Sequence, residues 1–375
     1  MARGNDTKDV QWKNTINAYK GIAAVAIAYF YHYKNEFGGE KPGVTLLQTW
    51  SGHNFLSNIY LYGYLGVELF FVISGFIMYY AYFAKIHSGS VKFSAFFFKR
   101  ISKIFPLFWT TTAVALVVQQ YNYMKSGEYY ITWINDLHHL VMNILGLQAM
   151  PGLILGQSFN APAWFLTVIF VCYALFYIFT KALDKEKLLY TSFFMVILGI
   201  WLVYNEDVVS MPFLNNAFGR GYLGFFWGII LAIIFERFEE RGYEKSVLIF
   251  MSIFSLGVWG YAFHFNLVGN INTTFSLCVC TSLIVLAKTS VILGKIAGLK
   301  IFRILGKASF SIYLWNFPTD MAFDLINRRY QCFDYSTLEI WGIHFGISLG
   351  VAIVSCYFLE PMLNRVFHKM TEKYL

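Results

Sequence analysis

Residues 60–83 read YLYGYLGVELFFVISGFIMYYAYF. Apart from tyrosines, these 24 residues contain a single ionisable side chain, that of Glu68. Because a helix crosses the hydrocarbon core of a bilayer with about 20 mostly apolar residues, the stretch predicts a transmembrane helix. The whole chain has the same bias: 57% of its 375 residues are hydrophobic and 13% are charged, roughly half the charged share of soluble domains. This composition excludes a soluble globular protein.

Nine further stretches have the length and hydropathy of a span. The ten predicted spans are residues 16–34, 60–83, 104–122, 164–181, 188–204, 219–236, 246–264, 270–288, 308–326 and 337–360. A weaker stretch at 131–150 carries Asp136, His138 and His139, and it predicts an interfacial or re-entrant helix on a long loop. We therefore expect an all-α integral membrane protein, a bundle of about ten transmembrane helices.

The distribution of Lys and Arg residues orients this bundle. If the N terminus is cytoplasmic, 23 of the 29 Lys and Arg residues fall in inside segments and 6 in outside segments. This bias follows the positive-inside rule and predicts that both termini are cytoplasmic. The predicted division is a cytoplasmic segment at 1–15, a transmembrane domain at 16–365 and a cytoplasmic tail at 366–375. The net charge of +8 is then explained by topology and does not indicate a nucleic-acid partner.

Several common functional motifs are absent from the sequence. It contains no GxxxxGK[ST], GxGxxG or GxSxG pattern, so the motifs of soluble enzymes are missing. The five cysteines are odd in number and lack metal-like spacing, and we read them as small core residues. We expect no metal, no disulfide framework and no cleaved signal peptide.

Ionisable side chains inside the predicted spans are candidates for function, because charge in a bilayer is costly. His32 lies at the outward end of the first span among aromatic residues, and it is either an interfacial side chain or a general base. Glu68 is either half of a structural ion pair or a functional acid. Arg220 begins the sixth span from the outer side, where it either snorkels to the interface or holds an anionic or sugar ligand.

Two further groups of residues flank spans. Lys99, Arg100 and Lys103 precede the third span, and they are either positive-inside anchors or an inward-facing site for phosphate groups. Trp164 opens the fourth span after a loop, and it is either an ordinary interfacial tryptophan or part of a binding site.

The order and spacing of these residues resemble the acyltransferase-3 family of membrane O-acyltransferases, over about residues 12 to 365. The matching segments, in family order, are INAYKGIAA at 16–24 followed by His32, GVELFFVISGF at 66–76, KRISKIFP at 99–106, AWFL at 163–166 with Tyr173, LGKASFSIYLW at 305–315, and Glu360-Pro361. The segment GVELFFVISGF is the most specific of them.

The chain also departs from the family's pattern. Lys20 stands in place of the usual Arg, and Glu68 stands in place of the usual Asp. His32 lies one residue further from Lys20 than is usual, about 100° around a helix. Ile169 occupies a position where many members carry Glu, and Asn316 occupies one where a His often follows Tyr-Leu-Trp. Neither of these two replacements can do acid–base work.

The resemblance implies transfer of an acyl group, by expectation acetyl from acetyl-CoA, to a sugar hydroxyl of a surface or lipid-linked polysaccharide in the cytoplasmic membrane of a bacterium. His32 would be the general base, and Glu68 or Lys20 would orient it or set its pKa. The acyl-CoA donor, the one cofactor-like molecule expected, would enter from the cytoplasm and bind Lys99, Arg100 and Lys103. The residues expected to bind the acceptor or stabilise the oxyanion are Arg220, Trp164, Tyr173 and Trp315.

A different class of protein, a transporter or flippase for a lipid-linked glycan, also fits ten spans with polar residues near the midplane. The sequence shows neither repeated halves nor paired Gly- or Pro-broken helices that would favour such a carrier. A catalytically inactive relative that acts as a scaffold is a further alternative, given the departures from the family's pattern.

Overall fold

The computed structural model describes residues 2–33, 37, 59–129, 134–153, 158–241, 245–264, 272–335 and 337–371. The elements of the first half are α1 (Ala2–Val25), the π-helical turn η1 (Ala26–His32), η2 (Gly63–Leu65), α5 (Gly66–His87), α6 (Phe93–Ser126), α7 (Leu137–Ile144), η3 (Ala161–Ala163) and α8 (Trp164–Ala182). Those of the second half are α9 (Lys185–Tyr204), α10 (Asn216–Arg241), α11 (Lys245–His264), α12 (Asn272–Thr289), α13 (Val291–Ala297), α14 (Lys300–Tyr330), α15 (Leu338–Val354), η5 (Ser355–Leu359) and α16 (Glu360–Thr371).

The described part of the chain is almost entirely helical, which confirms the predicted all-α class. Its strand-like pairing consists of one isolated bridge between Met211 and Leu214. The weaker stretch predicted as a helix on a loop contains α7, whose first turn is capped by Asp136 accepting a hydrogen bond from the backbone N–H of His139 at 2.8 Å. Residues 131–133 of that stretch lie outside the described residues.

The predicted number of about ten spans is not confirmed. Seven helices in the described ranges are long and apolar enough to cross a membrane, or eight if the pair α12 and α13, bent by 92°, forms one broken span. All ten predicted segments lie largely on helices, but α1 and α14 are too polar to qualify. Their polar side chains face a cavity and a buried hydrogen-bond chain, which explains how two such polar helices pack within the bundle.

Helices α5 and α10 pack closely against each other. A Cβ atom at Gly75 would overlap the backbone carbonyl of Phe225, and one at Gly228 would overlap that of Val72. Small residues that let helix backbones touch are the usual device of helix pairs in membranes. The close approach brings Glu68 of α5 and Arg220 of α10 within reach of each other.

A second close crossing joins α1 to α14. A Cβ atom at Gly21 would lie 2.6 Å from the carbonyl carbon of Leu305, and one at Gly306 would overlap the carbonyl of Asn17. The side chains next to these glycines, Lys20 and Lys307, are thereby placed around one space although they come from opposite ends of the chain.

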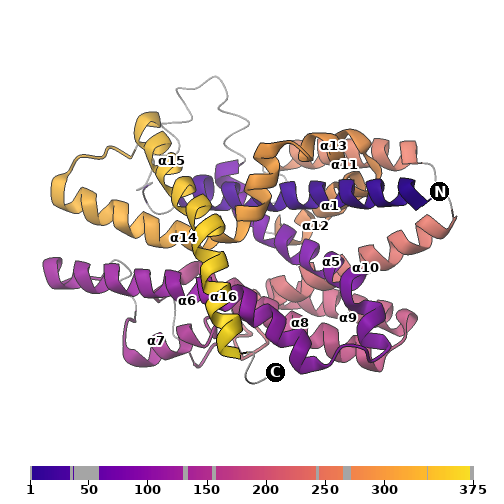
Figure 1. Ribbon diagram of the computed structural model, residues 1–375, viewed down its shortest axis with the longest axis horizontal. Coiled ribbons are helices and arrows are strands. Elements are labelled where there is room, and N and C mark those ends of the chain that lie inside the picture. Colours follow the sequence, from indigo (N-terminus) through magenta and orange to yellow (C-terminus); the bar gives the residue numbers. More distant parts are fainter. Residues whose placement is uncertain are drawn as a thin grey trace.

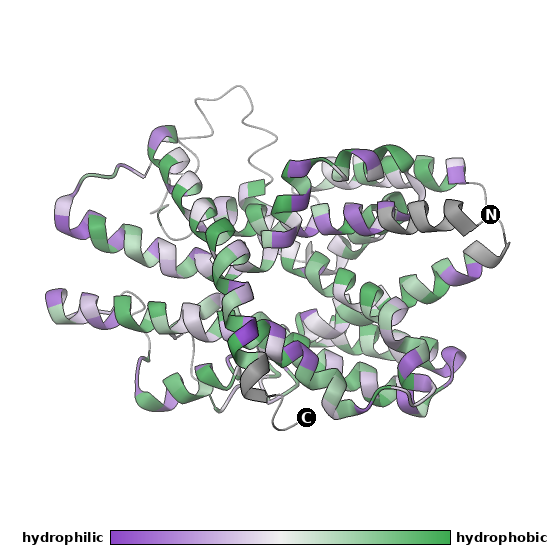
Figure 2. Cartoon of the chain, in the orientation of Figure 1, coloured by the Kyte–Doolittle hydropathy of each residue, from purple (hydrophilic) through white to green (hydrophobic). Residues whose placement is uncertain are grey.

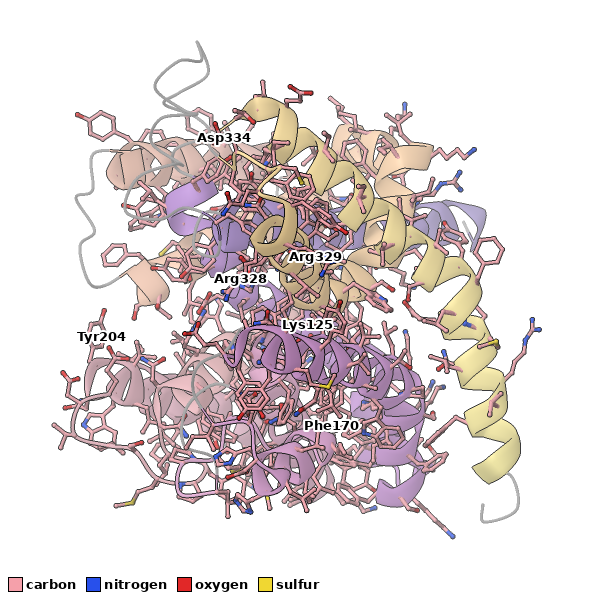
Figure 3. The ribbon with its side chains drawn as sticks, turned by 90° about the vertical axis from the view of Figure 1, so that its left-hand side faces the viewer. Lys125, Phe170, Tyr204, Arg328, Arg329 and Asp334 are labelled. Atoms are coloured by element: carbon pink, nitrogen blue, oxygen red, sulfur yellow. The ribbon has the colours of Figure 1, made fainter. Side chains whose placement is uncertain are left out.

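Helices α1, α6 and α14 run along the long axis of the molecule, whereas α15 and α16 cross them (Figure 1). Figure 1 shows α6 and α14 side by side, with their C-terminal ends at the left edge. Figure 3 looks at that end, where Lys125, Arg328 and Arg329 lie close together and Tyr204 of α9 lies to one side. Figure 2 shows apolar residues along most of the helices, and hydrophilic residues both at the ends of the molecule and near the middle of the view.

Candidate active site

A cavity of about 810 Å³ opens between α1, α5, α6, α8, α14 and α16. We call it the basic cavity, because its described lining contains one carboxylate, Glu360, and a ring of cationic side chains. These cations are Lys20, Lys99, Arg100, Lys103, Arg303 and Lys307. All three phosphate-site residues proposed from the sequence therefore face one space, and three cations from α1 and α14 join them. A space with such an excess of positive charge favours an anionic ligand.

Arg100 is the most deeply placed of these cations. It is 8% exposed, and its guanidinium carbon lies 3.5 Å from the ring centre of Phe96, 4.4 Å from that of Tyr82 and 5.2 Å from that of Tyr173. Its Nη1 donates to the carbonyl of Phe96, and its Nε has no hydrogen-bond partner among the described residues. An aromatic box therefore holds this cation without neutralising it.

The cavity becomes apolar away from its cations. Its remaining walls include Phe70, Phe165, Ile169 and Tyr313. Arg303 and Tyr313 are ten residues apart on α14, which corresponds to about 15 Å along the helix axis. Ile169 is part of this apolar wall and is 1% exposed, so position 169 contributes no carboxylate to the cavity.

Glu68 and Arg220 form a buried ion pair. The Nε of Arg220 donates to Oε1 of Glu68 at 2.5 Å, and the carboxylate is fully buried. The guanidinium carbon also lies 5.1 Å from the ring centre of Trp164. One carboxylate oxygen of Glu68 and Nη2 of Arg220 lack hydrogen-bond partners, so the pair retains capacity to bind a further polar group.

His32 begins a chain of buried hydrogen bonds. The side-chain amide of Asn316 donates to Nδ1 of His32 at 3.0 Å and to a carboxylate oxygen of Asp320 at 3.0 Å. The other oxygen of Asp320 lies 2.8 Å from Nε2 of His344, and both of these residues are fully buried. Residues four apart on α14 lie one above the other, which places Asn316 and Asp320 in line. These hydrogen bonds hold the His32 ring from the side of Nδ1.

The π-helical turn η1 carries His32 at its last position. A π-helix closes its hydrogen bonds from i to i+5 instead of i to i+4, so one turn takes up about one extra residue. A π-helical turn between Lys20 and His32 therefore has room for the one extra residue that the resemblance to the family indicates there.

A second cavity, of about 570 Å³, lies at the end of the molecule shown in Figure 3, among the ends of α8, α9 and α10. We call it the acidic cavity, because its described lining contains Glu206 and Asp207 and no Lys or Arg. The other lining residues are Gln148, Ala149, Met150, Pro151, Ser158, Ala161, Trp164, Val209, Ser210, Asn215 and Asn216. Trp164 faces this cavity, whereas its neighbour Phe165 faces the basic one.

The structure brings together some predicted site residues and separates others. Lys20 and Tyr173 line the basic cavity, and Glu68 pairs with Arg220 near Trp164. Lys20 and His32 are twelve residues apart, about 18 Å along a regular helix. The described contacts of His32 include neither Lys20 nor Glu68, and its orienting partner is Asn316.

Trp315 lines neither cavity. Its indole N–H donates to Ser355 at 2.7 Å, which ties α14 to η5. The sequence alone assigns no role to three residues behind or beside His32: Asn316, which cannot do acid–base work, Asp320 and His344. The available signal was an acid and a histidine inside two predicted spans.

Comparison with known proteins agrees with this arrangement. Residues 13–360 match the family described as "Acyltransferase domain". The chain belongs to this acyltransferase family. It is also similar to "Putative acetyltransferase ORF330" of Acidianus two-tailed virus, at 22% identity over 311 residues, which cover 79% of this chain and 80% of that protein. No solved structure matches it. The chain is therefore a multi-pass membrane acyltransferase, as its sequence predicted.

Proposed function

We propose that the protein transfers an acyl group, acetyl from acetyl-CoA, to a sugar hydroxyl of a surface or lipid-linked polysaccharide. The observation that carries the donor assignment is the basic cavity, with six cations, one carboxylate and an apolar far wall. Coenzyme A combines phosphate groups with a long, weakly polar pantetheine arm. Its phosphates would meet Lys99, Arg100 and Lys103, and the arm would extend toward Phe165 and the thioester.

The proposed reaction joins the sugar oxygen to the acyl carbon and breaks the bond between that carbon and sulfur. His32 takes the hydroxyl proton as the new bond forms, and the coenzyme A thiolate leaves toward the basic cavity. Arg220 supplies positive charge for the oxyanion that develops on the acyl oxygen, and Nη2 is its unpaired donor.

His32 needs a change in its hydrogen bonds to act as this base at Nε2. With the Asn316 amide donating to Nδ1, a neutral imidazole carries its proton on Nε2. If the amide turns over, its oxygen, which has no partner in the described structure, accepts from Nδ1 and leaves Nε2 free. The Asn316 amide would thus set the tautomer of His32.

We place the enzyme in the cytoplasmic membrane of a bacterium, with the basic cavity open to the cytoplasm. This side follows from the charge bias of the sequence and is where acyl-CoA is made. The acidic cavity then opens outward, toward exported glycans.

Equilibrium binding of free coenzyme A to the full chain in lipid nanodiscs tests the donor assignment. Arg100→Gln removes a charge-assisted contact worth about 1.5–3 kcal/mol, so we expect binding weaker by about 10- to 150-fold. Lys295→Gln on α13 makes a comparable charge change at an exposed site that lines neither cavity, and it should bind like the unmodified protein. Equal affinity of all three proteins would refute the donor site.

A further inference from the structure

The walls of the acidic cavity are fixed by hydrogen bonds between loops and helices. Asn215 donates to the carbonyl of Ala149 at 3.1 Å, and its side-chain oxygen accepts from the backbone N–H of Phe218 at 3.2 Å. Asn216 donates to a carboxylate oxygen of Glu206. These bonds tie the loop before α8 to the start of α10, so the polar groups of the cavity are preorganised for a ligand.

Gln148 holds an unsatisfied acceptor in the same wall. Its amide nitrogen donates to Asn143 at 3.1 Å, whereas its oxygen is buried and has no hydrogen-bond partner among the described residues. Asn143 in turn donates to Ser158 at 2.7 Å, which prevents Gln148 from turning freely. A buried acceptor without a donor costs free energy, and a ligand hydroxyl would supply that donor.

The charge of the cavity narrows the ligand class. Its described lining has two carboxylates and no cation, and the remaining polar groups are amides and hydroxyls beside the indole of Trp164. Carboxylates and amides bind hydroxyl groups, and an aromatic face packs against the C–H face of a sugar ring. The same carboxylates repel an anionic sugar and attract an amino group.

The position of the cavity connects it to the proposed chemistry. Trp164, Phe165 and Leu166 are consecutive at the start of α8, and the first faces the acidic cavity while the other two face the basic one. Side chains of consecutive helical residues point about 100° apart, so the start of α8 borders both spaces. Arg220, which stands 5.1 Å from the ring centre of Trp164, lies at this boundary.

We propose that the acidic cavity is the acceptor site and that it takes a neutral or amine-bearing sugar unit and rejects an anionic one. This inference rests on the proposed acyl transfer for its role, but sugar binding itself is measurable without turnover. Gln148 would accept a hydrogen bond from a sugar hydroxyl, and Glu206 with Asp207 would set the charge preference.

Saturation-transfer NMR on the full chain in nanodiscs, with three probe disaccharides, tests the site. The probes are N,N′-diacetylchitobiose, chitobiose with free amines, and a disaccharide containing glucuronate. We expect the first two to bind and the third to bind at least about tenfold more weakly. Gln148→Ala should weaken binding of the neutral probe about tenfold, because one buried hydrogen bond is lost.

A charge variant sharpens the same test. The double variant Glu206→Gln, Asp207→Asn should narrow the difference between the neutral and glucuronate probes to about threefold or less. Glu186→Gln is the control, because it removes one exposed carboxylate from the other end of α9 and should leave the preference unchanged.

Two results would overturn the acceptor site: equal binding of the glucuronate and neutral probes, or unchanged binding in Gln148→Ala. Failure of coenzyme A to bind the unmodified protein, with sugar binding intact, would instead refute the donor side of the proposed function. Each probe can also be offered with acetyl-CoA labelled in its acetyl group. We expect acetyl transfer to the neutral probe. In Gln148→Ala the acceptor KM should rise and the donor KM should stay unchanged.

Discussion

The two cavities of this protein differ in charge more than in size. The basic cavity has six cations and one carboxylate in its described lining, and the acidic cavity has two carboxylates and no cation. The start of α8 borders both cavities, and the buried pair of Glu68 and Arg220 lies beside Trp164 there. This difference in charge supports the proposal that the basic cavity takes a phosphorylated donor and the acidic cavity takes an uncharged or cationic acceptor.

The largest effect is expected from His32→Ala, which removes the chemistry and leaves both cavities intact. General-base catalysis contributes about 10²- to 10⁴-fold, so transfer of labelled acetyl to a sugar should fall by that factor. Coenzyme A and sugar binding should stay within about twofold of the unmodified protein. Retention of full transfer activity would remove His32 from the site.

Substitution of Glu68, beside the start of α8, is expected to lower the stability of the fold strongly. Glu68→Gln leaves the buried Arg220 without its partner, which should lower stability by about 3–5 kcal/mol, measured by thermal unfolding in detergent. The exposed pair of Glu186 and Arg237 provides the comparison, because Glu186→Gln should cost less than about 1 kcal/mol. Equal unfolding temperatures of the two variants would mean that the buried pair is not formed.

A smaller effect on catalysis is expected from substitutions of Asn316, the hydrogen-bond partner of His32. Asn316→Leu removes the side-chain oxygen that would accept from Nδ1 in the active tautomer of His32, and it leaves both cavities untouched, so kcat should fall about tenfold while both KM values stay constant. Asn316→His introduces a ring nitrogen near His32. It should recover part of the kcat that Asn316→Leu loses, and it should shift the pH dependence of kcat. A drop in donor or acceptor affinity with constant kcat would indicate a packing role instead.

The sequence predicted the helical class, the grouping of Lys99, Arg100 and Lys103, and the family. It could not predict the full basic cavity, because Lys20 and Lys307 meet only where Gly21 and Gly306 let α1 and α14 touch. That contact joins residues at opposite ends of the chain and leaves no local pattern.

The environment of His32 shows the same limit. Asn316 has no acid–base chemistry of its own, so residue type alone gave it no role, and its function depends on what it contacts. Regular helical geometry turns His32 by about 100° for one extra residue, and the sequence alone did not predict the π-helical turn that ends at His32. The acidic cavity was invisible for a similar reason, since Gln148, Glu206 and Asn215 come from separate loops and helix ends.

The most direct test of two substrates on two sides uses sealed vesicles containing the full chain in one orientation. Labelled acetyl-CoA is supplied on the side of the basic cavity, and N,N′-diacetylchitobiose is supplied on the other side or on the same side. The account predicts acetylated sugar when the two substrates are on opposite sides, and little product when both are on the side of the basic cavity. Product formed only when both substrates share one side would contradict it.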